Sequence, residues 1–506
     1  MNLTLIDWGI ITAYLAGCMA AGVWMKRFVR GVEDFAIAGR EMDLNLGIAS
    51  LAATELGVVT IMYTAQLGYE KGFAGATVGV IMALAMFLVG QTGFVIQPLR
   101  AARVMTIPEL FERRFGKGVR WLAGLFVVLG GLLNMGIFLL LGGKFLVYAT
   151  GLPPEYLKWV MTGLLGLVLL YTALGGMLSV LVTDYLQFIV MGLGIVITSI
   201  IVIGDIGWTN LIQKLWQCWD GSATGVGQTL KSQPFNPLHS SNYGWGYILW
   251  QLIFQTAVVT TWQTTISRVL ACKDEHTAKR MYRRTSFYFV GRFALPGLWG
   301  AAALVYFSFN GGLPEGLDSL TAMPAYLCKI LPVGLIGMVI AGMLAAEMST
   351  DSGYLLTWAT VIYNDLIMPV VKRPLAAKTK LLITRSLVVG IGVFLVFYGL
   401  WYELPGNAWD YLAVTGNIYL ASVFTLLVAG LYWKRATAAG AYAALVLGAI
   451  GPLTFLVVNQ VVSKENQIRP EVAGASSFAL AFLGMLVGSL LSHPPSPATA
   501  KPEAAV

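Results

Sequence analysis

The chain has 506 residues, of which 57% are hydrophobic and 11% are charged, and its formal net charge is +8. Soluble domains carry about 25% charged residues, so this composition excludes a string of soluble domains and favours a membrane protein with many spans. The basic residues lie in short loops between apolar runs, where the positive-inside rule accounts for them without a nucleic-acid partner.

Apolar runs of about 20 residues, the length that crosses a bilayer as a helix, recur along the whole chain. We therefore expect an all-α polytopic membrane protein in which residues 1–492 form a single transmembrane domain and residues 493–506 a disordered cytoplasmic tail. About 13 spans are predicted, near 5–26, 44–67, 73–97, 120–149, 157–176, 181–204, 243–267, 285–308, 332–364, 380–401, 408–432, 436–459 and 472–491.

Lysine and arginine gather in one set of alternate loops, and the opposite loops hold few of them. The positive-inside rule places the basic loops in the cytoplasm. An odd number of spans then puts the N-terminus outside and the C-terminus inside. We expect a multi-pass protein of the inner (plasma) membrane of the cell.

Two apolar spans carry polar stretches near their middle: SLAATELGVVT (50–60) in the second span and AAEMSTDSG (345–353) in the ninth. The first contains a carboxylate, Glu55. A charge at the bilayer centre costs at least about 2.5–3.5 kcal/mol on the insertion scale, so such residues usually face a cavity or a partner. We predict that the two stretches form the walls of one mid-membrane ion site in an ion-coupled solute transporter.

In the ninth span, Ala346, Ser349 and Thr350 share one helix face at about 100° per residue. Two hydroxyls and a freed carbonyl suit a hard cation such as sodium, which prefers oxygen ligands. The same hydroxyls could instead bond to carbonyls of their own helix and let helices approach closely. The residues by themselves leave both interpretations open.

In the second span, Ala53 and Leu56 are three residues apart and would offer free carbonyls if the helix unwinds between Glu55 and Val58. Gly57 followed by β-branched residues makes such a break plausible. Unwound backbone at this depth is tolerated only where it lines a cavity, and broken helices hold ions and substrate in transporters. The second span therefore supplies the complementary half of the predicted site.

Asp184, in the segment TDYLQ, lies near the inner end of the sixth span. A carboxylate at that depth either binds an ion or pairs with a cationic side chain. Arg292 of the eighth span is the candidate partner for such a pair.

Four segments resemble the sodium/solute symporter family: FAIAGREM (35–42), MTIPELFERRFG (105–116), YTALGGMLSVLVTDYLQ (171–187) and AAEMSTDSGYLL (345–356). The resemblance implies a LeuT-type fold with two inverted repeats of five helices, at about 44–204 and 243–432. It also implies sodium-coupled symport of a small organic solute by alternating access. Sodium is then the cotransported ion, no organic cofactor or enzymatic activity is expected, the partners are the solute and the lipid bilayer, and the chain is expected to act as a monomer.

Carried over by position, the resemblance implies functional residues of three kinds. The main sodium site would use the carbonyls of Ala53, Leu56 and Ala346 with the hydroxyls of Ser349 and Thr350. A second sodium position would use Asp184 and Ser352, but Gly353 replaces the serine of two-sodium members, so one sodium ion is expected. The candidate solute contacts are Glu55, Gly57, Thr60, Asn134, Gln255 and Asn417.

Two alternatives stay open at this stage. Glu55 and Glu347 would suit a proton-coupled carrier on the same fold, and a membrane sensor with a symporter-like domain is a further alternative. The resemblance does not choose the solute, since the family carries amino acids, sugars, vitamins and monocarboxylates.

Overall fold

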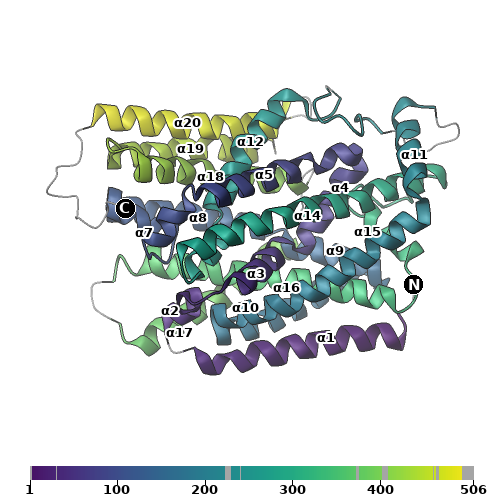
Figure 1. The fold of residues 1–506 in the computed structure, drawn as a ribbon, viewed down its shortest axis with the longest axis horizontal. Helices are drawn as coiled ribbons and strands as arrows, with labels where there is room; N and C mark the ends of the chain where they lie inside the picture. The colour runs from purple at the N-terminus through teal and green to yellow at the C-terminus, as the bar shows by residue number, and fades with distance from the viewer. Residues whose placement is uncertain are drawn as a thin grey trace.

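The computed structural model describes residues 3–29, 31–222, 230–239, 241–371, 375–401, 408–459, 461–462 and 466–492. Every named element within these ranges is a helix, which confirms the all-α prediction. Most helices lie side by side along one axis, with α1 (Leu5–Trp24) at one edge and α19 (Ala438–Val458) and α20 (Pro470–Leu491) at the other (Figure 1). The expected disordered tail, 493–506, lies outside the described residues.

The other helices lie between these edges. In chain order they are α2 (Val32–Ile37), α3 (Leu44–Glu55), α4 (Val58–Lys71), α5 (Thr77–Thr92), α6 (Ile96–Ala101), α7 (Ile107–Phe115), α8 (Lys117–Met135), α9 (Phe138–Thr150), α10 (Leu157–Ile206), α11 (Trp208–Asp220), α12 (Gly244–Thr261), α13 (Gln263–Ala271), α14 (Glu275–Phe309), α15 (Ala322–Ile330), α16 (Leu335–Val361), α17 (Ala377–Trp401) and α18 (Ala408–Tyr432). Short 3₁₀ segments and one π-helical turn, Ile362–Ile367, join some of them.

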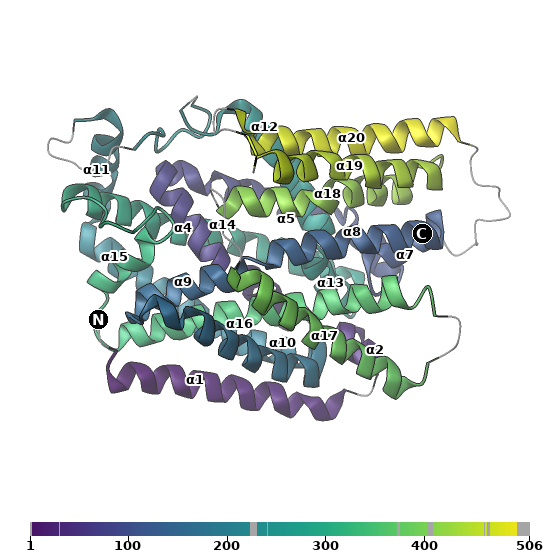
Figure 2. The same ribbon diagram turned by 180° about the vertical axis from the view of Figure 1, so that it is seen from behind.

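Within the described residues, ten helical segments are long and apolar enough to cross a membrane, whereas the sequence predicts about 13. The segment Val58–Thr92 joins half of the second predicted span to the third, α10 joins the fifth to the sixth, and the broken pair α12–α13 is not among the ten. The count of 13 stays a prediction. Figures 1 and 2 place the start of α1 and the end of α20 at opposite ends of the molecule, as an odd number of crossings requires.

The element α10 contains two predicted spans because the chain turns within it. A straight helix of 50 residues would be about 75 Å long, far more than the apolar thickness of a bilayer. Gly176 has φ 54° and ψ −145°, outside the helical region. A Cβ at this position would lie 2.5 Å from the carbonyl oxygen of Phe35. Glycine therefore permits both the change of direction and the close approach to α2.

The second predicted span is broken where the sequence analysis expects it. α3 begins after Asp43, whose carboxylate accepts a hydrogen bond from the Leu46 amide, and it ends at Glu55. Leu56 (φ −104°, ψ 63°) and Gly57 (φ −73°, ψ 165°) are not helical, and α4 starts at the next residue. The break between α3 and α4 confirms the predicted unwinding.

A second break, which the sequence analysis does not predict, separates α12 from α13. Trp262 has φ −62° and ψ 110° there. Neither glycine nor proline lies at this position, so the local sequence carries none of the usual signals of a helix end. The two breaks fall in the first helix of each predicted repeat.

Candidate functional site

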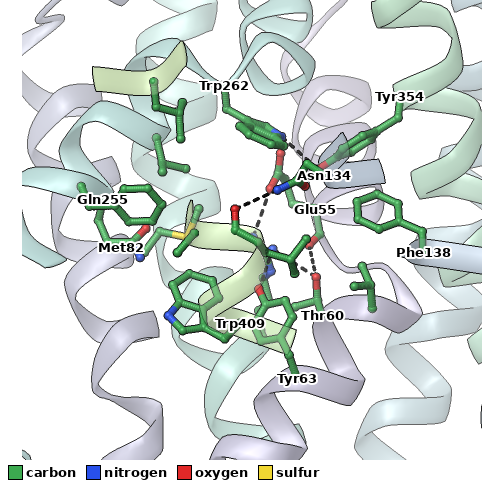
Figure 3. A pocket seen from close by; sticks show the side chains of 17 residues that line it. Glu55, Thr60, Tyr63, Met82, Asn134, Phe138, Gln255, Trp262, Tyr354 and Trp409 are labelled. Carbon is green, nitrogen blue, oxygen red and sulfur yellow. Dashed lines mark hydrogen bonds and ion pairs between the residues drawn. The ribbon is translucent and has the colours of Figure 1, made fainter. Parts of the chain in front are cut away.

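A cavity lies between the two broken helices (Figure 3). Its lining comes from α3, α4, α5, α8, α9, α12, α14, α16 and α18, together with the break between α12 and α13. The lining residues are Glu55, Val59, Thr60, Tyr63, Met82, Asn134, Phe138, Phe254, Gln255, Val258, Trp262, Arg292, Tyr354, Trp409, Leu412, Ala413 and Leu420. Concave sites with apolar walls and a few placed polar groups are typical of small-molecule binding.

An ion pair crosses the polar side of the cavity. Glu55 Oε2 lies 3.2 Å from Arg292 Nη1, and Glu55 Oε1 accepts a hydrogen bond from the Thr265 hydroxyl at 2.6 Å. Arg292 Nη2 donates to the hydroxyls of Thr60 (3.2 Å) and Tyr63 (3.4 Å). Among the described residues, nothing accepts a hydrogen bond from the buried Arg292 Nε. The pair is neutral as a whole, and the Nε–H group of Arg292 is left without an acceptor among the described residues.

Two amides contribute further polar groups to the cavity. Asn134 Nδ2 donates to the Leu412 carbonyl (2.9 Å) and to the Thr415 hydroxyl (3.1 Å), which holds the side chain against α18. Gln255 Nε2 donates to Gln251 Oε1 at 2.9 Å. Gln255 Oε1 is buried and has no hydrogen-bond partner in the described part of the chain. Arg292 and Gln255 both line the cavity, and each keeps one buried polar atom without a partner among the described residues.

Aromatic rings close two sides of the cavity. Tyr63 and Trp409 lie together with ring centroids 5.1 Å apart. Trp262 lies on the opposite side, where its Nε1 donates to the Tyr354 hydroxyl at 2.9 Å (Figure 3). Phe138 packs edge-on against Tyr354 with centroids 5.0 Å apart. A bound solute would therefore have flat apolar surfaces on two sides and polar groups between them.

A second buried cluster surrounds Asp184 in α10. Ser50 and Ser349 donate to its two carboxylate oxygens, at 2.6 Å and 2.5 Å. The cationic partner is Arg268, whose Nη2 lies 3.5 Å from Asp184 Oδ2, and both side chains are fully buried. The predicted pairing with Arg292 is therefore wrong, because that arginine lies in the cavity beside Glu55.

The residues expected to bind the main sodium ion lie on helices that meet at the break. All five are buried: Ala53, Leu56, Ala346, Ser349 and Thr350. The Thr350 hydroxyl donates to the Thr54 carbonyl at 3.0 Å. A Cβ on Gly57 would lie 2.5 Å from Thr350 Oγ1. Ser349 points to Asp184, as described above. The Ala53 carbonyl accepts from the Leu56 amide at 3.3 Å. The hydroxyls of Ser349 and Thr350 thus face α10 and α3 instead of bonding back to their own helix.

Ser352, expected at a second sodium position, has a different arrangement. Its hydroxyl donates to the Ser349 carbonyl of its own helix at 3.1 Å. The adjacent Gly353 lies against the Arg268 guanidinium, since a Cβ there would be 2.7 Å from Nη2. Ser349 connects the two residues, because its hydroxyl donates to Asp184 and its carbonyl accepts from Ser352. The positive charge beside Asp184 belongs to Arg268.

Of the six expected solute contacts, Glu55, Thr60, Asn134 and Gln255 line the cavity. Gly57 packs against Thr350 behind it. Asn417 is fully buried in α18, outside the cavity lining, and its amide atoms have no hydrogen-bond partner among the described residues.

Thirteen of the 17 lining residues are not among the predicted solute contacts, and they include Arg292, Trp262, Trp409 and Tyr63. Arg292 had a usable signal, because an arginine inside an apolar span indicates a functional position. The aromatic residues had none, since rings are common in any apolar span.

A central cavity between two broken helices is typical of secondary transporters. The model of the sodium:solute symporter family matches residues 35–448, most of the chain. The chain therefore belongs to the sodium:solute symporter family, and it is a sodium-coupled symporter of a small organic solute, not an enzyme.

Similar proteins span nearly the whole chain. A sodium/glucose cotransporter of Vibrio parahaemolyticus is 25% identical over 483 residues, which cover 90% of this chain and 85% of that protein. Sodium/myo-inositol cotransporter 2 of Mus musculus is 26% identical over 507 residues, covering 92% and 72%. The solved structure of a Na⁺-coupled sialic acid symporter in a substrate-bound outward-open state superimposes with a TM-score of 0.80 at 19% identity, covering 97% of this chain and 99% of that one. This similarity confirms the LeuT-type fold.

Proposed function

We propose that one sodium ion binds at the break between α3 and α4. Its ligands would be the carbonyls of Ala53, Leu56 and Ala346 and the hydroxyls of Ser349 and Thr350. The observation that carries this proposal is the position of Thr350, whose hydroxyl contacts the unwound segment from the facing helix. Oxygen ligands from freed backbone and from hydroxyls suit a hard cation.

We also propose that the solute is neutral and rich in hydroxyl groups, such as a sugar or a cyclitol. The observation that carries this assignment is that the only charged side chains among the described lining residues, Glu55 and Arg292, neutralise each other. A solute with a net charge would enter a buried site without a free counter-ion, which is costly. Hydroxyls can both donate and accept, so a rearrangement of the two side chains on binding would let them pair with Arg292 Nε and Gln255 Oε1, which are buried and without a partner among the described residues.

The aromatic walls agree with this class of solute. Trp409 and Trp262 lie on opposite sides of the cavity, and aromatic faces provide large apolar contact surfaces. A sugar or cyclitol ring has apolar C–H faces and a polar rim of hydroxyls. Relatives of this chain are described as transporters of glucose, myo-inositol and mannose, which supports the assignment.

Sodium and solute would be coupled through the unwound segment that they share. Glu55 ends α3, lines the cavity, and lies between the carbonyl positions of Ala53 and Leu56. Sodium at the break would order this segment and with it the Glu55–Arg292 pair. Coupling of this kind is reciprocal, so the solute must raise the affinity for sodium by the same factor. Alternating access would then carry both across the bilayer.

The finer architecture is part of the same proposal. The breaks at Leu56–Gly57 and at Trp262 each fall in the first helix of a predicted repeat, 44–204 and 243–432, which supports two structurally related halves. We propose a multi-pass monomer of the inner (plasma) membrane with the N-terminus outside and the C-terminus in the cytoplasm. Addition of an impermeant cysteine reagent to intact cells, with single cysteines placed in loops, tests this orientation.

Thermal unfolding of the purified transporter tests the solute and the ion together. Sugars, cyclitols, amino acids, monocarboxylates and vitamins are each added in sodium and in potassium buffer at two pH values. A ligand that binds only the folded state raises the melting temperature by mass action. We expect a sugar or cyclitol to stabilise the protein in sodium only. Stabilisation by an amino acid or a monocarboxylate contradicts the solute class, and stabilisation that depends on pH and not on sodium favours proton coupling.

A further inference from the structure

Two buried acidic side chains of α16 differ from the other buried acids. Six such side chains are buried in the described part of the chain: Asp7, Glu55, Asp184, Glu347, Asp351 and Asp365. Glu55, Asp184 and Asp365 lie 3.2, 3.5 and 2.8 Å from an arginine nitrogen, and Asp7 accepts hydrogen bonds from the amides of Gly334 and Gly337 at 2.9 Å. Glu347 and Asp351, both in α16, have no such partner among the described residues.

Glu347 and Asp351 lie on one face of α16, since residues four apart are separated by only about 40°. Both oxygens of Asp351 and Oε1 of Glu347 are buried without a hydrogen-bond partner in the described structure. No arginine or lysine of the described residues forms an ion pair with either side chain. An ionised carboxylate that is buried alone is so costly that it becomes neutral instead, and like charges at this spacing also repel each other. A bound proton removes both costs.

The surroundings of Glu347 are apolar and tightly packed. A Cβ added at Gly142 of α9 would lie 2.6 Å from Glu347 Oε1 and 3.0 Å from Oε2, so the carboxyl group lies against the backbone of α9. Among the described residues, Glu347 is the only polar side chain that lines the small cavity beside it, and Val58 and Phe145 are among the apolar ones. A metal cation needs several oxygen ligands, whereas a proton needs only the carboxyl group itself.

Charged and titratable groups on the helices that pack against α16 are engaged elsewhere. Tyr14 of α1 and Tyr171 of α10 donate to Met348; Glu55 of α3 and Tyr63 of α4 contact Arg292; Arg268 of α13 pairs with Asp184; Arg120 of α8 pairs with Asp365; Arg385 and Tyr398 of α17 contact the Leu174 carbonyl and Tyr411; Glu33 of α2 pairs with Arg40; and Tyr354 of α16 accepts from Trp262. Lys144 and Tyr148 lie about 200° and 240° round α9 from Gly142, so they point away from Glu347.

The two carboxyl groups lie next to the proposed sodium ligands. Glu347 follows Ala346 directly, and Ser349 and Thr350 lie within one turn of it on the same helix. Val58, which lines the cavity beside Glu347, is the first residue after the break between α3 and α4. A charge on Glu347 would therefore act on an ion at the break through the protein interior, where electrostatic interactions are strong.

We propose that Glu347 and Asp351 form a proton-binding site whose proton opposes sodium binding at the break between α3 and α4. The inference rests on the proposed function, in which a sodium ion binds at that break. When one of the two carboxyl groups releases its proton to the solution, the carboxylate that remains puts a negative charge near the ion position and strengthens sodium binding. The coupling is reciprocal, so sodium binding promotes release of the proton.

Infrared difference spectroscopy tests the proton site in the absence of sodium. A protonated carboxyl group has a C=O stretching band that a carboxylate lacks. Full-length transporter in detergent is measured in potassium buffer at neutral pH. We expect Glu347→Gln combined with Asp351→Asn to lose a carboxylic-acid band that the wild type shows. Glu33→Gln is the control and should lose none, because Glu33 is 59% exposed and paired with Arg40.

Sodium titrations at several pH values test the link to the ion. Bound radioactive sodium is measured with choline as the replacement salt. The wild-type affinity should increase with pH, by up to about tenfold per pH unit where one proton leaves as one ion binds. The double variant is neutral at both positions at every pH, so its affinity should stay at the value that the wild type has at acidic pH. Glu33→Gln should follow the wild type.

The melting temperature shows whether the double variant folds normally. Glutamine and asparagine match the shape and the neutral charge of the protonated side chains, so the double variant should melt close to the wild type in potassium buffer at neutral pH. A large loss of stability would mean that the two groups are charged in the folded protein, and it would overturn the inference.

Two further results would overturn the inference. One is a double variant that loses no carboxylic-acid band, and the other is the same pH dependence of sodium affinity in the wild type and the double variant. A wild type that binds no sodium at any pH would count against the proposed site at the break. In that case a band lost in the double variant would still support the proton site.

Discussion

Glu55 and Arg292 form a buried ion pair inside the central cavity, with 3.2 Å between Oε2 and Nη1. Glu55 is the last residue of α3 and Arg292 lies in α14, so the pair connects the break in the first broken helix to a neighbouring helix. Both residues also line the cavity. The charges of the solute site therefore depend on each other and on the geometry of the break.

Glu55→Gln should destabilise the transporter and abolish solute uptake. The substitution leaves Arg292 buried without its counter-charge, and the loss of one partner of a buried pair costs about 3–5 kcal/mol. The solute site would also gain a net positive charge. Melting temperature in detergent and sodium-driven uptake into proteoliposomes measure the two effects.

An exposed pair and a double variant serve as controls for this prediction. Glu33 forms an ion pair with Arg40 at 2.9 Å, but its side chain is 59% exposed, so Glu33→Gln should cost no more than about 1 kcal/mol. Glu55→Gln combined with Arg292→Gln should be more stable than Glu55→Gln alone, because no charge is left unpaired. Wild-type stability in Glu55→Gln would contradict a structural role for the pair.

The sequence identifies one member of each buried pair but not the pairing. A carboxylate in an apolar span is unusual on solvation grounds alone, so both Glu55 and Asp184 could be found. Their partners depend on how α13 and α14 pack against α3 and α10, and helix periodicity does not report that packing. The sequence therefore suggests Arg292 as the candidate partner of Asp184, whereas the structure pairs Asp184 with Arg268 and Arg292 with Glu55.

The two helix breaks show a similar contrast. Gly57, followed by β-branched residues, disfavours a continuous helix locally, and the predicted break is present. Trp262 lies in a stretch without glycine or proline, so the break there depends on packing around the cavity. A helix break that follows from local conformational preference can be predicted from the sequence. A break imposed by tertiary contacts cannot.

Gly57→Ala should lower both stability and sodium affinity. The added Cβ would lie 2.5 Å from Thr350 Oγ1 and 3.1 Å from its Cβ, and overpacking of this kind costs about 1–3 kcal/mol. The threonine would have to move away from the proposed sodium position. Sodium titrations of uptake and of melting temperature measure the change.

Gly163 offers the matched control, since it is also helical but a Cβ there meets nothing within 4 Å. Gly163→Ala should be neutral or slightly stabilising, because alanine favours a helix over glycine by about 1 kcal/mol. Equal sodium affinity in Gly57→Ala and Gly163→Ala would argue against contact between Thr350 and the ion site.

Ser349→Ala combined with Thr350→Ala should raise the sodium concentration for half-maximal uptake about tenfold or more. The double variant removes two proposed ligands, and about 1.4 kcal/mol corresponds to a factor of ten in affinity. A matched control lies further along the same helix, where Thr357 and Thr360 donate only to carbonyls of α16, at 2.7 and 2.8 Å. Thr357→Ala with Thr360→Ala should leave the sodium dependence unchanged. Normal sodium dependence in the first double variant would remove Ser349 and Thr350 from the site.

Asn134 and Asn417 should differ in their effect on the solute, although both are buried amides in the membrane interior. Asn134 lines the cavity, and its Nδ2 is engaged with Leu412 and Thr415. Its carbonyl oxygen is then the atom left to accept a hydrogen bond from a solute hydroxyl. Asn134→Ala should raise the KM for the solute by a factor of about 2 to 10, the range that one hydrogen bond of 0.5–1.5 kcal/mol supplies.

Asn417→Ala should leave the solute KM unchanged. Its amide lies outside the cavity lining and has no hydrogen-bond partner among the described residues, so its removal takes nothing from a bound solute. Any effect should appear in the melting temperature, and it should be small, because no hydrogen bond within the described structure is lost. An increase in KM for Asn417→Ala as large as that for Asn134→Ala would mean that the solute reaches a part of α18 outside the cavity lining, and the proposed boundary of the solute site would be wrong.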